Sequence, residues 1–304
     1  MKTFEGVSRK GVHGRPWKQF FRDLKNEIKE DNVTNGAAAL GFYLMLAIFP
    51  AMIFLLSLLP YLPIPNLQQA VMDLLNQALP GEASMMFTGT VNEVVGQKKG
   101  GLLSFGALLT IWAASAGMYA VMQQLNITYD VKEGRPFWKA RGTAIVLTLF
   151  FGVLIVGAFG LIVGGGALQA YLLENLGGGQ VLMTVFSVVR WLIIAAALTL
   201  AFAITYRFAP DVKQRFAFVT PGSLFGVILL VVATLGFKFY VDGFGKYSAT
   251  YGSIGAVIAL MLWLNIVGLV LLLGSEVNAL VEHYSPKGKQ KGEKVEGQKE
   301  RRAA

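Results

Sequence analysis

Residues 252–281 read GSIGAVIALMLWLNIVGLVLLLGSEVNALV, thirty residues in which Glu276 is the one charged side chain. An α-helix needs about 20 apolar residues to cross the hydrocarbon core of a bilayer, so this stretch is long enough to span one. In the whole chain 54% of residues are hydrophobic and 15% are charged, whereas an average soluble domain has roughly 25% charged residues. The stretch and the composition together predict an integral membrane protein.

Five further segments have the same apolar character and length. Together with residues 252–281 they predict an all-α integral membrane fold with six transmembrane helices. The predicted spans are residues 36–62, 101–122, 142–168, 181–208, 216–240 and 252–281. We therefore expect one transmembrane domain over residues 36–281, a cytoplasmic N-terminal segment over residues 1–35 and a C-terminal tail over residues 282–304.

The distribution of basic residues predicts the orientation of the chain. With six spans both termini lie on one side. That side carries 22 Lys and Arg residues: eight before the first span, four between spans two and three, three between spans four and five, and seven in the tail. The other side carries five. Because cytoplasmic loops are enriched in Lys and Arg, we expect both termini in the cytoplasm.

The segments outside the spans have distinct patterns. Trp17, Phe20, Phe21, Leu24 and Ile28 share one face of a predicted amphipathic helix over residues 17–30. This helix either lies on the inner membrane surface or packs on the ends of the bundle, and the two interpretations are compatible. The long outer loop, residues 63–99, predicts a helical cap that is either structural or gates access. The basic tail has almost nothing to bury and predicts disorder.

Several motifs in a fixed order carry a resemblance to a known family. The motifs are Ala37-Ala38-Ala39-Leu40-Gly41-Phe42-Tyr43 with Phe49-Pro50, Trp112-Ala113-Ala114-Ser115 with Leu125-Asn126-Ile127-Thr128-Tyr129 and Arg135-Pro136-Phe137, Tyr206-Arg207-Phe208-Ala209-Pro210 with Pro221-Gly222, Tyr240 through Tyr251-Gly252-Ser253 with Leu262-Trp263-Leu264, and Leu273-Gly274-Ser275-Glu276-Val277-Asn278-Ala279. Over about residues 20–282 the chain resembles the YihY/BrkB family, formerly mislabelled as ribonuclease BN. The resemblance implies six spans in a bacterial inner membrane. It also implies relatives described as transporters or virulence-associated factors.

The residues that hydrolytic chemistry requires are missing from the pattern. The sequence has no cysteine and two histidines, His13 and His283, both outside the spans. RNA cleavage needs a metal cluster or paired general acids and bases, and no such motif occurs. The glycine runs lack the lysine of a P-loop. We therefore predict no catalytic residues, no metal, no cofactor and no nucleic-acid partner; the expected partners are membrane lipids, and a homo-oligomer is left open.

Charged residues near the outer side form one candidate site. Arg190 enters span four from this side, and Lys238 and Asp242 are spaced i, i+4 on span five, followed by Lys246. Ionisable groups in a bilayer are costly, so each needs a reason. One interpretation is a cationic vestibule for an anionic headgroup or solute; the other is a set of snorkelling anchors.

Polar residues near the inner side form a second candidate site. Glu276 and Asn278 lie near the end of span six, Asn126 ends span two, and Arg135 lies in the following loop. Glu276 has two interpretations: an ion pair with a loop arginine that closes the bundle, or a carboxylate that couples transport to a proton or cation. Asn126, Arg135 and Asn278 are predicted to be structural or gating residues.

Two further positions lie within the spans. Asn265 is near the middle of span six, where it either hydrogen-bonds between helices or contacts substrate. Pro50 lies within span one and removes a backbone hydrogen bond, which produces a static kink or a hinge. From these features we predict a transporter or flippase for an anionic lipid or small solute; the alternative is a non-transporting envelope-integrity protein.

Overall fold

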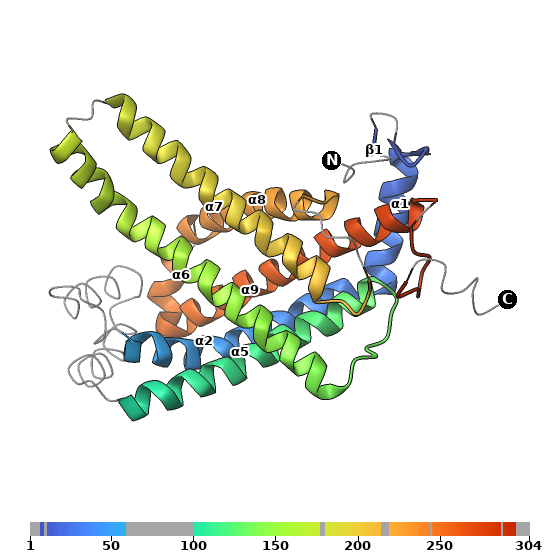
Figure 1. Ribbon diagram of the computed structural model, residues 1–304, viewed down its shortest axis with the longest axis horizontal. Coiled ribbons are helices and arrows are strands. Elements are labelled where there is room, and N and C mark those ends of the chain that lie inside the picture. Colours follow the sequence, from blue (N-terminus) through green and yellow to red (C-terminus); the bar gives the residue numbers. More distant parts are fainter. Residues whose placement is uncertain are drawn as a thin grey trace. The chain divides into compact units, whose positions relative to one another are not determined.

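The computed structural model describes residues 7–8, 11–58, 100–176, 180–213, 219–243, 245–286 and 288–295. Over these residues the fold is almost entirely helical (Figure 1). The helices are α1 (Trp17–Glu30), α2 (Val33–Leu58), α5 (Gly100–Thr128), α6 (Phe137–Leu176), α7 (Gln180–Phe208), α8 (Pro221–Gly243) and α9 (Gly245–Tyr284).

Four helices are long and apolar enough to cross a membrane among the residues described. The qualifying stretches are Phe137–Ile155, Met183–Phe208, Pro221–Val241 and Val257–Tyr284. Large apolar side chains on these helices remain exposed; Phe239 on α8, for example, is 83% exposed. Such extensive apolar exposure is unfavourable in water and fits a lipid environment.

Four of the six predicted spans lie within a helix and the other two overlap one: residues 59–62 of the first lie outside the described residues, and residues 216–220 precede α8. The clearest difference is α8, which begins at Pro221 instead of residue 216. Thr220 is the N-cap: its hydroxyl oxygen accepts the Ser223 N–H at 3.0 Å, and Ser223 Oγ accepts the Thr220 N–H at 2.8 Å. Pro221 then occupies the first helical position, where its missing N–H costs nothing.

The N-terminal segment also contains a small sheet that the sequence pattern did not predict. Strands β1 (Val7–Ser8), β2 (Gly11–Val12) and β3 (Arg15–Pro16) pair antiparallel in the order β1-β2-β3. The last turn uses His13 and Gly14, both with positive φ. The sheet leads directly into α1.

Backbone contacts divide the chain into two compact units, which are described separately. The first unit is Met1–Val33, Val121–Leu230 and Val270–Ala304. In it α6 and α7 contact each other and run in opposite directions (Figure 1). Phe20 and Leu24 of α1 pack on Val277 and Leu280 of α9. The apolar face of α1 is therefore covered by α9, which matches the second interpretation of the amphipathic helix.

The second unit is Thr34–Ala120 and Val231–Leu269. Here α2 approaches α9 closely: a Cβ added at Gly41 would lie 3.1 Å from the Asn265 nitrogen, and one at Gly268 would lie 3.0 Å from the Ala37 carbonyl oxygen. Small residues at such positions allow two backbones to approach each other. The Phe237 and Trp263 rings, 5.1 Å apart, connect α8 to α9.

Some predictions concern residues outside this description. The outer loop of residues 63–99 lies outside the described residues, as do residues 296–304 of the tail. The described part of the tail, residues 288–295, differs from the predicted disorder. We call these residues the C-terminal strap. Lys213 N–H donates to the Lys294 carbonyl oxygen at 2.8 Å, and the strap lysines pair with acids of the first unit.

Candidate functional site

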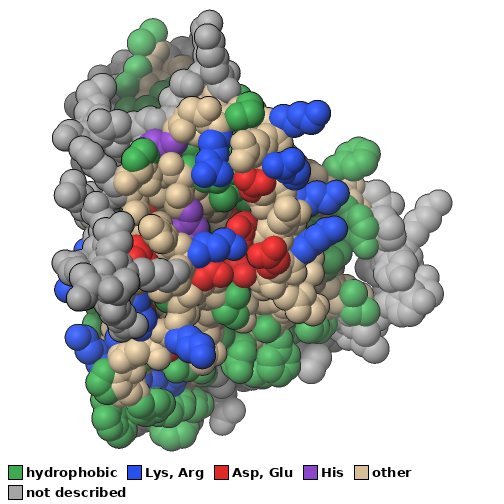
Figure 2. Space-filling view, turned by 90° about the vertical axis from the view of Figure 1, so that its right-hand side faces the viewer, with side chains coloured by type: hydrophobic (Ala, Val, Ile, Leu, Met, Phe, Trp, Pro, Cys, Tyr) green, Lys and Arg blue, Asp and Glu red, His purple; other side chains and the backbone are tan. Residues whose placement is uncertain are grey.

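The ends of several helices of the first unit meet in a polar region, which we call the polar end. It consists of the α1–α2 turn, the loop that follows α5, the loop that follows α7, the start of α8, the last turns of α9 and the C-terminal strap. Figure 2 shows basic and acidic side chains together on the face that holds α1 and the end of α9.

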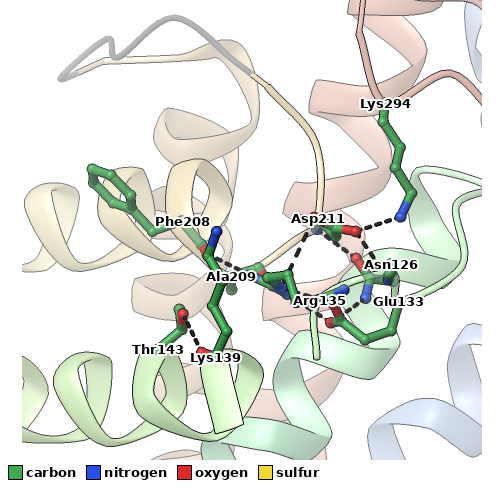
Figure 3. A network of polar contacts seen from close by, with 10 residues as sticks. Asn126, Glu133, Arg135, Lys139, Thr143, Phe208, Ala209, Asp211 and Lys294 are labelled. Atoms are coloured by element: carbon green, nitrogen blue, oxygen red, sulfur yellow. Dashed lines mark hydrogen bonds and ion pairs between the residues drawn. The ribbon is translucent and has the colours of Figure 1, made fainter. Parts of the chain in front are cut away.

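Arg135 is the centre of one network in the polar end (Figure 3). Its side chain is 11% exposed. Its guanidinium donates to both carboxylate oxygens of Glu133, at 2.8 and 2.7 Å, and to the Ala209 carbonyl oxygen at 2.8 Å. Asn126 extends the network: its Nδ2 donates to Glu133 at 3.0 Å, and its Oδ1 accepts the Asp211 N–H at 2.7 Å. The network thus connects the loops after α5 and α7.

The carboxyl groups of Glu133 and Asp211 both lie beside hydrogen-bond donors and a basic side chain. Burial opposes ionisation of Glu133, but the Arg135 hydrogen bonds outweigh it and lower the pKa of this carboxyl. Asp211 accepts the Gly134 N–H at 3.0 Å and pairs with Lys294 of the strap. Fixed donors therefore hold Glu133 as a carboxylate, and they fix the position of the Asp211 side chain.

The start of α8 is bound tightly to α9. Asn278 Oδ1 accepts the Gly222 N–H at 2.8 Å, so it satisfies one of the free donors of the α8 N-terminus. A Cβ at Gly222 would collide with the Gly274 carbonyl oxygen. The buried Tyr206 hydroxyl donates to the Leu271 carbonyl oxygen at 2.8 Å. These contacts fix the turn of α9 that carries Glu276.

Glu276 itself has an environment of acids. It is 1% exposed, and its Oε1 accepts no hydrogen bond from the described residues. No Lys or Arg of the described part of the chain forms an ion pair with it. Its carboxyl instead lies within hydrogen-bonding reach of Asp31, with Glu27 and Asp130 nearby. The predicted pairing with a loop arginine does not occur within the described residues; Arg135 pairs with Glu133.

Two helix ends bring these acids together. Asp130 is the αL residue that ends α5: its N–H donates to the Ile127 carbonyl oxygen, and the Val131 N–H to that of Asn126, which is a Schellman motif. Asp31 lies in the turn after α1, where its N–H donates to the Glu27 carbonyl oxygen at 2.9 Å. The partial negative charge of a helix C-terminus disfavours a carboxylate at both places.

Lys291 of the strap is the basic side chain that lies among these acids. Its Nζ lies 2.6 Å from Glu27, 3.5 Å from Glu30 and 3.8 Å from Asp130. Burial opposes its charge, but the hydrogen bond to Glu27 and the neighbouring acids raise the pKa of Lys291. Burial raises the pKa of Asp31 to about 6, against an ordinary value of 3.8. The Lys291 charge acts in the opposite direction.

The remaining predicted site residues lie elsewhere. Arg190, in α7 of the first unit, has a buried Nε that makes no hydrogen bond to described residues, and its guanidinium lies 5.8 Å from the Trp191 ring. Lys238 is exposed on α8 within the second unit. Asn265 lies at the α2–α9 contact. The side chains of Asp242 and Pro50 lie outside the described residues, although α8 and α2 pass through these positions.

Several residues of the polar end were not singled out by sequence reasoning. They include Asp31, Glu133, Asp211 and Lys291. Asp31 is the last charge before the first predicted span, which is the one sequence signal that marks it. Among the described residues, no group of three or more His, Asp or Glu side chains is placed to hold a metal ion.

Long apolar helices with exposed apolar faces and a polar end define the class: a polytopic, all-α integral membrane protein. The family model described as Virulence factor BrkB matches residues 24–299, so the chain belongs to this family. Its curated relatives include the "Putative ribonuclease-like protein YfkH" of Bacillus subtilis (strain 168), 34% identical over 86% of this chain and 94% of the relative.

A more distant relative is a "UPF0761 membrane protein" of Vibrio campbellii (strain ATCC BAA-1116). It is 27% identical over 88% of this chain and 84% of its own length. A similarly named protein of Aeromonas salmonicida (strain A449) is 24% identical over 87% of this chain and 89% of its own length. No solved structure matches the chain significantly.

Proposed function

We propose that this protein is a transporter that moves an anionic lipid or a small solute across a bacterial inner membrane. In this proposal the chain spans the membrane six times with both termini in the cytoplasm. The apolar segments and the excess of basic residues on one side support this topology. The polar end of the first unit then faces the cytoplasm.

The observation that carries the proposal is the burial of Glu276. It lies within Val257–Tyr284, a stretch of α9 apolar enough to cross a membrane, and is 1% exposed. A charged carboxylate at such a position costs a few kcal/mol on insertion scales. A purely structural carboxylate would have a cation beside it, whereas the charged groups that act most strongly on Glu276 are other acids. A carboxyl group that is buried among other acids is expected of a residue that changes its charge during a transport cycle.

We propose that polar side chains in each unit separately contact an anionic group of the substrate: Arg190 in the first unit, and Lys238, Asp242 and Asn265 in the second. The buried Nε of Arg190 lacks a hydrogen-bond acceptor among the described residues, which supports a role in binding an oxyanion. The competing function is that of a non-transporting envelope-integrity protein, in which these charges anchor helices.

Flux in proteoliposomes tests the proposal. Purified protein is reconstituted, and the transbilayer movement of a fluorescent phosphatidylglycerol and the efflux of small organic anions are measured. We expect flux of one substrate class for wild type, its loss in Glu276→Gln, and its retention in Lys25→Gln, which removes an exposed charge of α1. Absence of wild-type flux, or full flux in Glu276→Gln, would support the non-transporting alternative.

A further inference from the structure

The carboxyl groups of Asp31 and Glu276 face each other without a donor between them. Asp31 Oδ2 and Glu276 Oε1 are both buried, and neither accepts a hydrogen bond from the described residues. The two side chains nevertheless lie within hydrogen-bonding reach of each other. Two ionised carboxylates contain acceptors only and repel each other, so a contact of this kind requires a proton on one of them.

We infer that Asp31 and Glu276 form a single proton-binding site at the polar end, whose proton affinity Lys291 of the C-terminal strap sets. One statement of this inference rests on the proposed function, namely that this proton is the ion coupled to substrate movement. The existence of the site itself is independent of transport.

The surrounding groups account for the choice of a proton over a metal ion. Glu27 of α1 and Asp130 at the end of α5 both act on the pair, and Lys291 neutralises part of their charge. The described residues provide no cluster of three acidic or imidazole ligands for a metal ion. A proton satisfies the pair without further ligands, because it converts one acceptor into a donor.

Neighbouring contacts hold the pair in place. The Ser275 hydroxyl, next to Glu276, lies 2.5 Å from that of Thr128 on α5. Asn32, next to Asp31, has a positive φ of 52° and turns the chain from α1 into α2. The α1–α2 turn and α9 therefore bring the two carboxyl groups together as parts of fixed backbone elements, and the strap closes over them from the side of Glu27.

The strap can change the proton affinity of the site. The Lys291 side chain is 45% exposed, so this lysine is accessible to solvent. Because the Lys291 charge lowers the pKa of Asp31, release of the strap strengthens proton binding, and docking of the strap weakens it. A change in the strap thus alters the pH at which the pair releases a proton.

Infrared difference spectroscopy of the reconstituted full-length protein tests the inference, with the protonated carboxyl band as the readout. We expect wild type to show this band at neutral pH and a second component that titrates at about 6. Glu276→Gln should lose the neutral-pH band, because an amide replaces the proton donor, whereas Lys25→Gln, which removes an exposed charge of α1, should retain it. The amide backbone bands of each variant check that the fold is intact.

The strap variant keeps the test decisive if Glu276→Gln fails to fold. Lys291→Gln should move the component that titrates at about 6 to higher pH, and Lys25→Gln, which removes an exposed charge from α1, should not move it. A neutral-pH band that is absent in wild type, that persists in Glu276→Gln, or that disappears on addition of sodium would overturn the proton assignment. A band without any flux would preserve the site and refute the proposed transport, whereas flux without the band would do the reverse.

Discussion

The close contact between α8 and α9 makes a sharp prediction for the variant Gly222→Ala. Gly222 lies in the first turn of α8, directly against Gly274 and Asn278 of α9. A Cβ added there would lie 2.6 Å from Asn278 Cγ, whereas ordinary contacts begin at 3.4 Å, and it would also collide with the Gly274 carbonyl oxygen. The two helices must therefore separate by about 1 Å, a shift typical of an overpacked site.

The energetic cost follows from these contacts. Overpacking of a close-packed contact costs about 1–3 kcal/mol. The separation also weakens the hydrogen bond from Gly222 N–H to Asn278 Oδ1, which is 2.8 Å long and contributes about 1 kcal/mol. The higher helix propensity of alanine offsets at most about 1 kcal/mol. We expect Gly222→Ala to be less stable than wild type by about 2 kcal/mol.

The matched control is Gly152→Ala, because a Cβ at Gly152 of α6 meets nothing within 4 Å. The free energy of unfolding of both variants is measured by titration with sodium dodecyl sulfate in mixed micelles, followed by far-ultraviolet circular dichroism. Gly152→Ala should be as stable as wild type or slightly more stable. Equal stability of Gly222→Ala and Gly152→Ala would refute the close α8–α9 contact that positions Glu276.

The remaining predictions concern the polar end. Arg135→Lys should lower the free energy of unfolding by about 1–3 kcal/mol, because an ammonium cannot reproduce the forked contact with Glu133; detergent unfolding checks this. Tyr206→Phe should cost about 1 kcal/mol through the lost bond to the Leu271 carbonyl oxygen, measured in the same way. The raised pKa of Asp31 means that the folded state binds more protons than the unfolded state between pH 3.8 and about 6, so wild-type stability should fall as pH rises through this window. A difference of this size corresponds to about 3 kcal/mol for a fully buried group, and partial solvent exposure reduces the expectation to about 1–2 kcal/mol. Asp31→Asn should remove this pH dependence, and an unchanged slope in the variant would contradict it.

The lengths of the apolar segments predicted the helices well, because the thickness of the bilayer sets how many apolar residues a span needs. Four of the six predicted spans lie within a helix, and the start of α7 differs by one residue from the predicted boundary at residue 181. The shift of α8 to Pro221 came from a reciprocal cap between Thr220 and Ser223, a local hydrogen-bond pattern that hydropathy does not register. The family assignment from ordered motifs is confirmed by the match over residues 24–299.

Sequence reasoning was weaker for the site, because partners separated along the chain cannot be paired from spacing. Arg135, expected near Glu276, pairs with Glu133 two residues away. Asp31, whose carboxyl faces Glu276, precedes it by most of the chain. The composition of the tail predicts almost no buried residues, yet Lys291 and Lys294 form ion pairs with acids of the first unit. Pairing of strap lysines with distant acids depends on the folded backbone, and composition alone cannot reveal it.

The motifs that carry the family resemblance also have a spatial meaning. Asn126, Arg135, Tyr206, Gly222 and the segment from Gly274 to Asn278 come from five separate motifs, and all of them belong to the polar end of the first unit. Their hydrogen bonds fix loops and helix ends around Glu276. A purely structural closure would be satisfied by apolar packing or by one ion pair at this position. Fixed donors surround an acid pair with which no Lys or Arg of the described residues forms an ion pair. This arrangement matches the proton site that we propose, which is why the test of function belongs at Glu276.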